Sequence, residues 1–394
     1  MKKITKVVSI ILALLMMIMS VVSCGSSNNE PEKGANGLTK LKLGGIGPLT
    51  GDYANYGTSV KQGAELAVKE INAAGGINGF EFDLAFEDSK GDPDSAVAAY
   101  GSLIDKGMKV SLGAVFSGEM ASVTAAAAQD GILLLSPSAS AKDSISGNDA
   151  AFRVCFNDPQ QGSASAVFID ENQLAKKVAV FYQSDIDYSK GLYETFQAEC
   201  KVRGIEITTV ETFTASTNTD FSSQISKIKN SGAEMVFIPI YAAEASTFLT
   251  QAYGKLNDMI FFGCDGLDGI LTKVSEPKYA ENVMMLTPFS ADDTDEKVQH
   301  FVKEYKATYN VVPDQFAADG YDAIYAIAEA IKSANATPEN FMDDTFNANM
   351  VAAMTKIEVA GVTGTMTWTA DGETNKAAKA MIIHDGVAAL YKAK

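Results

Sequence analysis

The chain is poor in the residues from which catalytic and metal sites are commonly built. Its 394 residues include only 2 histidines, His300 and His384, which lie far apart and away from any cysteine cluster. This scarcity argues against a histidine-based zinc site. The sequence also lacks a G-x-S-x-G nucleophile elbow and a G-x-x-x-x-G-K-[ST] phosphate loop. We therefore predict no metal ion, no cofactor and no enzymatic activity.

Positive charge is also in short supply. Lysine and arginine total 32 against 49 aspartates and glutamates, which gives a net charge of −17. Such a surface repels phosphate backbones, so we predict that the protein binds no nucleic acid. With 46% hydrophobic and 21% charged residues, the composition excludes a disordered chain and a multi-span membrane protein. At roughly 150 residues per domain, the length predicts two or three domains.

The beginning of the chain has the pattern of an export signal. Three lysines in the first six residues precede the apolar run 7–22, as is typical of signal peptides. The run ends in VVSCG (21–25), which resembles the lipobox of bacterial lipoproteins, although valine replaces the usual leucine. We predict a signal peptide over 1–23, a lipidated Cys24 that anchors the protein outside the cell membrane, and a flexible tether over 24–40. An uncleaved anchor helix is the alternative.

Past residue 40, short β-rich runs alternate with longer amphipathic stretches. Strands are predicted at 41–48, 81–88, 110–115, 132–135, 177–182, 206–213, 235–239 and 259–263, and helices at 57–74, 94–106, 119–130, 162–173, 189–203, 221–231 and 243–256. This order predicts right-handed βαβ crossovers and an α/β fold with mostly parallel sheets. Because the strands are too many for one open sheet, we predict two sheets in two lobes. Ligands of such sheets bind at the carboxyl ends of the strands.

Cysteine usage does not indicate a disulfide framework. Beyond Cys24 the chain has Cys155, Cys200 and Cys264, an odd number with wide spacing. We interpret these three as buried small apolar residues, while a bridge between Cys155 and Cys264 stays open at this point.

The loops that follow the predicted strands of the first half are rich in glycine and serine. The loop 45–51 is glycine-rich, but Pro48 has no N–H to offer a phosphate, which disfavours a dinucleotide site. Ser117 follows the third strand, and three serines in the segment 136–140 follow the fourth. Hydroxyls and free N–H groups at helix N-termini favour a small anion such as a carboxylate. Ordinary helix capping is the alternative for each serine cluster.

The loops after the strands of the second half instead offer aromatic rings and a carboxylate. Tyr188, Tyr241 and Asp265 each come shortly after a predicted strand. These groups suit the apolar body and the ammonium of a zwitterion. Donors for a carboxylate in one lobe and an acid in the other would hold opposite ends of a ligand, an arrangement that drives closure.

Five stretches of the chain form a distinctive combination. They are the run 46–93, DGILLLSPSASA (130–141), the Arg153…Asp158-x-x-Gln161-Gly162 segment, DYSKGLYETF (187–196) and FFGCDGLDG (261–269). Together they resemble the leucine/isoleucine/valine-binding proteins of ABC transporters, the branched-chain amino-acid type of periplasmic binding protein. The resemblance extends from about Leu41 to the end of the chain.

This resemblance implies a type I periplasmic binding protein fold, in which three crossovers join two Rossmann-like lobes. The implied crossovers lie near 155–157, 287–290 and 362–365. Lobe 1 would comprise residues 41–155 and 290–362, and lobe 2 residues 156–289 and 363–394.

The resemblance also implies a binding site for an amino acid. Its carboxylate would be held at Ser117 and the Ser138–Ser140 segment, and its ammonium by a backbone carbonyl at Ser138 and by Asp265, where relatives often have glutamate. The implied ligand contacts are Ser117, Ser138, Ala139, Ser140, Tyr188, Tyr241 and Asp265, with Tyr56 and Phe116 lining the side-chain subsite.

We therefore predict an extracytoplasmic solute-binding lipoprotein of an ABC importer, which captures a small amino acid by closure of its lobes. The aromatic subsite favours an apolar or branched side chain. The partners would be the permease and ATPase subunits of the membrane complex, and the protein itself would be a monomer. The alternatives are a sensor of the same fold that signals to a membrane partner, and a hydrolase that uses Ser117.

Overall fold

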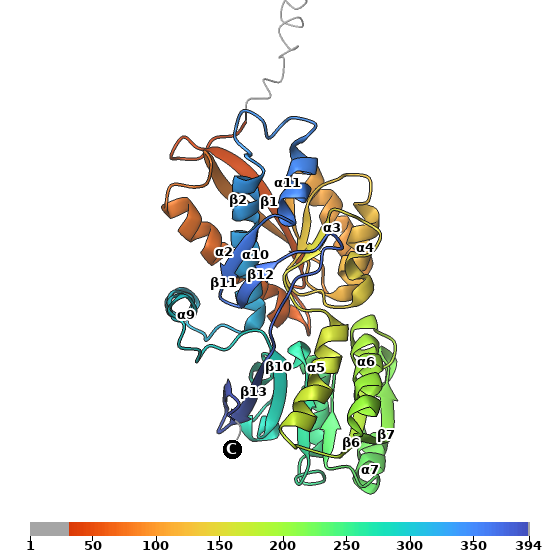
Figure 1. Cartoon of the computed structure of the whole chain (residues 1–394). Coiled ribbons are helices and arrows are strands. Elements are labelled where there is room, and N and C mark those ends of the chain that lie inside the picture. Colours follow the sequence, from red (N-terminus) through yellow and green to blue (C-terminus); the bar gives the residue numbers. More distant parts are fainter. Residues whose placement is uncertain (1–30, 393–394) are drawn as a thin grey trace, which may run out of the picture.

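The described chain, residues 31–392 of a computed structural model, forms two α/β lobes stacked end to end (Figure 1). The predicted signal peptide and the predicted lipidation site Cys24 lie outside the described residues. One sheet has the strand order β2-β1-β3-β4-β5 and the other β14-β13-β10-β9-β8-β6-β7. A two-stranded hairpin, β11-β12, stands apart from both. The described residues contain no helix with the length and apolar character needed to cross a membrane.

The first lobe is built on an all-parallel sheet. Its strands are β1 (Thr39–Gly47), β2 (Phe80–Asp88), β3 (Val110–Ala114), β4 (Leu134–Ser136) and β5 (Ala151–Arg153). The helices of this lobe are α2 (Ala54–Ala73), α3 (Pro93–Asp105), α4 (Ser117–Ala126), α9 (Glu296–Tyr309), α10 (Gln315–Ser333) and α11 (Phe346–Met354). The pair α2 and α10 covers one face of the sheet and the pair α3 and α4 the other (Figure 1).

The second lobe has a mixed sheet, in which β13 runs antiparallel to both of its neighbours. Its strands are β6 (Lys177–Gln183), β7 (Glu206–Phe213), β8 (Met235–Phe237), β9 (Ile260–Gly263), β10 (Val283–Thr287), β13 (Lys379–His384) and β14 (Val387–Leu390). Its helices are α5 (Asp158–Glu171), α6 (Asp187–Arg203), α7 (Ser222–Asn230) and α8 (Ala242–Ala252). The hairpin strands are β11 (Glu358–Gly361) and β12 (Gly364–Thr367). Cys155, Cys200 and Cys264 are buried free thiols, so no Cys155–Cys264 bridge forms.

Two glycines allow α2 and α10 to pack with their backbones nearly in contact. A Cβ atom on Gly63 would lie 1.9 Å from the carbonyl oxygen of Ala317, and one on Gly320 would lie 2.3 Å from that of Val60. Any larger residue would push the helices apart. This close approach buries most of α10 and makes it the central helix of the first lobe.

The chain just before β1 folds back on that strand. Lys33 forms an isolated antiparallel bridge with Thr39, and the Nζ atom of Lys40 donates to Glu32 at 2.6 Å. The part of the expected tether that the structure describes, residues 31–40, is therefore folded against the start of β1.

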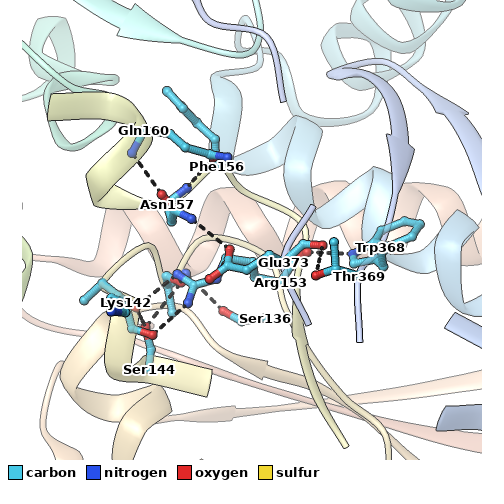
Figure 2. Close-up of polar contacts among 12 residues, drawn as sticks. Ser136, Lys142, Ser144, Arg153, Phe156, Asn157, Gln160, Trp368, Thr369 and Glu373 are labelled. Atoms are coloured by element: carbon cyan, nitrogen blue, oxygen red, sulfur yellow. Dashed lines mark hydrogen bonds and ion pairs between the residues drawn. The ribbon is translucent and has the colours of Figure 1, made fainter. Parts of the chain in front are cut away.

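Three chain connections join the lobes, and buried polar contacts tie two of them together (Figure 2). Arg153, at the end of β5, is completely buried and its Nε atom lies 3.3 Å from the carboxylate of Glu373. The carbonyl of Arg153 accepts a hydrogen bond from Trp368 Nε1 at 2.8 Å, and Asn157 Nδ2 donates to Glu373 at 3.0 Å. The third connection lies between β12 and β13, over residues 368–378. It comes later than the resemblance implied, because residues 358–367 first pair as a hairpin.

Candidate ligand-binding cleft

A cavity of about 350 Å³ opens between the two lobes. The first lobe lines it with Tyr53 and with the segment 116–119 at the start of α4, and the second lobe lines it with Tyr188 and Tyr241. Of the residues predicted from the sequence, Phe116, Ser117, Tyr188 and Tyr241 all face this cavity.

The N-terminus of α4 provides hydrogen-bond donors on the side of the first lobe. The first bond within the helix runs from Met120 N to Phe116 O at 2.8 Å, so the N–H groups of residues 117–119 have no acceptor within the helix. The Oγ atom of Ser117 accepts a hydrogen bond from the N–H of Ala141 at 3.0 Å. Free N–H groups and the positive end of the helix dipole together suit a carboxylate.

Most polar groups of the serine cluster after β4 are already hydrogen-bonded within the protein. Ser136 Oγ donates to Ala114 O and Ser138 Oγ donates to Val115 O, both at 2.8 Å. The carbonyl of Ala139 accepts a hydrogen bond from Arg153 Nη1 at 2.9 Å. Ser140 differs, because its buried Oγ atom has no hydrogen-bond partner among the described residues. Ser140 is therefore the hydroxyl of this segment that remains available to a ligand.

Asp265 lies directly after β9, in a short 3-10 helix over Asp265–Leu267, and is buried. Its Oδ1 atom accepts hydrogen bonds from Tyr188 Oη at 2.7 Å and from Gly266 N at 2.8 Å, and its Oδ2 atom accepts one from Gln161 Nε2 at 2.9 Å. Burial raises the pKa of Asp265, while the bonds from Tyr188 and Gln161 lower it. The structure thus brings Tyr188 and Asp265 into direct contact and holds the carboxylate in one orientation.

A second buried carboxylate, Asp158, lies at the start of α5 beside the serine cluster. Its N–H donates to the carbonyl of Ser140 at 2.9 Å, whereas neither of its carboxylate oxygens has a hydrogen-bond partner within residues 31–392. Burial raises the pKa of Asp158 well above its usual range, and the charge of Asp265 raises it further. An ammonium placed between the two acids would relieve both effects. In the sequence, Asp158 stands out only as part of the family motif Arg153…Asp158-x-x-Gln161-Gly162, directly after the first predicted crossover.

Aromatic rings from both lobes, Tyr53, Phe116, Tyr188 and Tyr241, line the cavity, and the fully buried Tyr56 packs behind Phe116. The ring centroids of Phe116 and Tyr241 lie 4.8 Å apart, those of Tyr188 and Tyr241 4.7 Å, and those of Tyr56 and Phe116 5.3 Å. The hydroxyl of Tyr56 is hydrogen-bonded to the second lobe and is not free for a ligand. It donates to Gly266 O at 2.7 Å and accepts from Ala242 N at 2.8 Å. The wall therefore offers ring faces and edges to a ligand side chain, as an apolar group requires.

Glu119 lines the cavity mouth and makes the stability of the protein depend on pH. Burial raises the pKa of Glu119 from 4.5 to about 7. A raised pKa means that the folded protein retains the proton longer than the unfolded chain, so this group reduces stability as the pH rises from about 4.5 to about 7. Between pH 5 and pH 8, the free energy of unfolding of Glu119→Gln should fall by about 1–3 kcal/mol less than that of the wild type. Urea denaturation at the two pH values measures both. Parallel pH profiles for the variant and the wild type would contradict this assignment.

Two stacked α/β lobes with a cavity between them define a two-lobed solute-binding protein. Residues 40–386 match the sequence profile of the family described as periplasmic binding protein, and the chain belongs to this family. The predicted family resemblance and the predicted type I fold are confirmed. The family serves transporters and is not a family of enzymes.

Characterised relatives cover most of the chain. It is 30% identical over 301 residues to Leu/Ile/Val-binding protein homolog 3 of Brucella melitensis biotype 1, an alignment that spans 76% of this chain and 81% of the relative. It is also 30% identical over 301 residues to the leucine-, isoleucine-, valine-, threonine-, and alanine-binding protein of Pseudomonas aeruginosa, and this alignment spans 76% of this chain and 80% of that relative.

Solved structures show the same architecture. The branched-chain amino acid transporter substrate binding protein LivJ of Streptococcus pneumoniae, in complex with isoleucine, has a TM-score of 0.81 and 30% identity, covering 90% of this chain and 99% of LivJ. A solute binding protein of R. palustris in complex with benzoate shares the fold at 21% identity and a TM-score of 0.79, with 89% and 95% covered. The chain is accordingly a substrate-binding protein of the ABC-transporter type.

Proposed function

We propose that this protein captures a free α-amino acid in the interlobe cleft and presents it to an ABC importer. One observation carries the proposal. Uncharged donors come from the first lobe, namely Ser117 at the cavity and the free hydroxyl of Ser140 at the first crossover, and two buried acids come from the second lobe, namely Asp158 beside Ser140 and Asp265 bonded to the cavity residue Tyr188. A zwitterion can meet both sets at once, with its carboxylate on the donors and its ammonium between the acids.

The ligand side chain is proposed to be apolar or branched. The aromatic wall of Phe116, Tyr188 and Tyr241 supports this choice, because it offers apolar contact area near Ser117. The names of the Brucella and Pseudomonas relatives and the isoleucine bound to LivJ support it further.

The remaining features of the prediction belong to the same proposal. Lipidation at Cys24 would anchor the protein outside the cell membrane, and the export pattern of residues 1–23 supports this. The protein would act as a monomer, with lobe 1 over 41–155 and 290–367, which includes the hairpin, and lobe 2 over 156–289 and from β13 onward, so that only the third boundary moves from the expected 362/363 to the connection 368–378. The permease and ATPase subunits would be the membrane partners. The sensor alternative lacks support from the relatives, and neither histidine lines the cleft beside Ser117, as a hydrolase would require.

A thermal-shift panel tests this function. Protein that has been unfolded and refolded, to remove carried-over ligand, is heated with each of the common amino acids in turn. We expect isoleucine, leucine or valine at a hundred times its Kd to stabilise the folded state by about 2.7 kcal/mol. The absence of a shift with every amino acid would contradict the proposed function, whereas a shift confined to polar amino acids would correct the side-chain assignment alone.

A further inference from the structure

The lobes contact each other directly where two helices begin. Tyr53 precedes α2 in the first lobe, and Glu244 lies in the first turn of α8 in the second. The hydroxyl of Tyr53 donates to Glu244 Oε1 at 2.5 Å, across 191 residues of sequence. Tyr56, one turn further along α2, accepts a hydrogen bond from Ala242 at the start of α8. The N-termini of α2 and α8 are therefore docked on each other through two tyrosine hydroxyls.

The bond between Tyr53 and Glu244 is partly buried, with a half-buried donor and a buried acceptor. The side chain of Glu244 is 5% exposed, and burial raises its pKa. The ring of Tyr53 packs edge-on against Phe116 from its own lobe, at 5.5 Å, and against Tyr241 from the other lobe, at 5.8 Å. A hydrogen bond to a carboxylate is stronger when water is excluded and its partners are held in place.

We propose that Tyr53 and Glu244 form a closure latch, which holds the two lobes together without any atom of the ligand. Because its two groups come from different lobes, the bond exists only while the lobes are closed. The latch therefore shifts the equilibrium between open and closed forms toward the closed form even in the empty protein. Affinity for any ligand of the closed form rises with the population of that form. Tyr53 and Glu244 act here as positioning residues, and the latch does not depend on which ligand the cleft takes.

Small-angle scattering of the ligand-free protein tests the latch. Tyr53→Phe removes only the hydroxyl, and Glu244→Met replaces the carboxylate with an apolar group of similar length. Both variants are expected to have a larger radius of gyration than the wild type. Tyr100→Phe is the matched control, because Tyr100 Oη donates to Asp130 at 2.7 Å within the first lobe. Its radius is expected to equal that of the wild type, although its thermal stability falls.

Binding kinetics with L-isoleucine as the probe give a second readout. Tyr53→Phe is expected to raise the Kd about tenfold, through faster dissociation, since hydrogen bonds to charged groups contribute more than neutral ones. The double variant Tyr53→Phe/Glu244→Met is expected to be no weaker than the weaker single variant, because both substitutions break one bond.

The latch is overturned if Tyr53→Phe and Glu244→Met keep the wild-type radius without ligand, or if their effects on dissociation add. A wild-type protein that binds no amino acid would contradict the proposed function. The scattering comparison would still decide on the latch, so the two failures are distinguishable.

Discussion

Replacing Asp265 with asparagine is expected to weaken the binding of a zwitterionic amino acid by at least about a hundredfold. The substitution keeps the shape of the side chain and one of the two oxygens that accept from Tyr188 and Gln161, but it removes the negative charge beside the proposed ammonium. Isothermal titration calorimetry with L-leucine measures the change in Kd. Circular dichroism and thermal unfolding check that the variant keeps its fold.

A ligand without the ammonium provides the control for this experiment. The wild type is expected to prefer leucine strongly over 4-methylpentanoate, which has the same carbon skeleton and no amine. Asp265→Asn should lose most of this preference, and Asp158→Asn should lose part of it, since both acids face the proposed ammonium position. Unchanged discrimination in Asp265→Asn would remove this residue from the binding site.

Replacing Lys376 with methionine is expected to destabilise the protein by about 3–5 kcal/mol. Lys376 lies in the third connection, and its side chain is completely buried. Its Nζ atom lies 3.5 Å from Oδ1 of Asp319 and also contacts the hydroxyl of Thr363. That hydroxyl and the N–H of Thr363 donate to Asp322. Removal of the only cation within this group would leave Asp319 without its ion-pair partner and Asp322 with hydrogen bonds as its only compensation. Urea denaturation at pH 7 measures the loss.

The protonation of Asp319 gives this prediction a pH signature. Burial raises the pKa of Asp319 to about 8, although the charge of Lys376 opposes that rise. Without Lys376 the folded protein holds this proton more tightly, so the destabilisation should be larger at pH 8 than at pH 6.

Two further variants control for the loss of a lysine as such. Lys332→Met breaks a surface pair with Glu329 on the same helix and should cost less than about 0.5 kcal/mol. Asp319→Asn combined with Lys376→Met removes one charge of each sign and should recover part of the stability. A loss below about 1 kcal/mol in Lys376→Met would contradict the structural role assigned to this group.

The alternation of β-rich runs with amphipathic stretches in the sequence was enough to predict the layers of the fold. The strand predicted at 206–213 coincides with β7, because its β-branched residues and flanking turns identify it locally. The strand β5 was not predicted, since its 3 residues are too few to display a period. The helix predicted from residue 119 begins at Ser117, and that difference places the serine hydroxyl within the first turn, at the edge of the cleft.

The binding site, like the fold, could be predicted from the sequence only in part. Serines, tyrosines and an acid after successive strands are visible in the sequence, because parallel strands bring their carboxyl ends to one edge of a sheet. The sequence does not show which of these groups have hydrogen-bonding atoms left free for a ligand. Ser138 and Ala139 are occupied by the backbone and by Arg153, whereas Ser140 and Asp158 keep free acceptor atoms, and this distinction depends on contacts between segments distant in the chain.

The order of residues along the chain thus establishes two lobes with mostly parallel sheets, an export pattern and the chemical types of groups at the strand ends, because hydrophobic period and turn residues are local properties. The pairing of Tyr53 with Glu244, the contact of Lys376 with Asp319 and the hydrogen bond from Tyr56 to Gly266 arise only when the lobes and the hinge are assembled. Each of these contacts joins residues that lie tens to hundreds of positions apart, and no local pattern in the chain encodes such a distance.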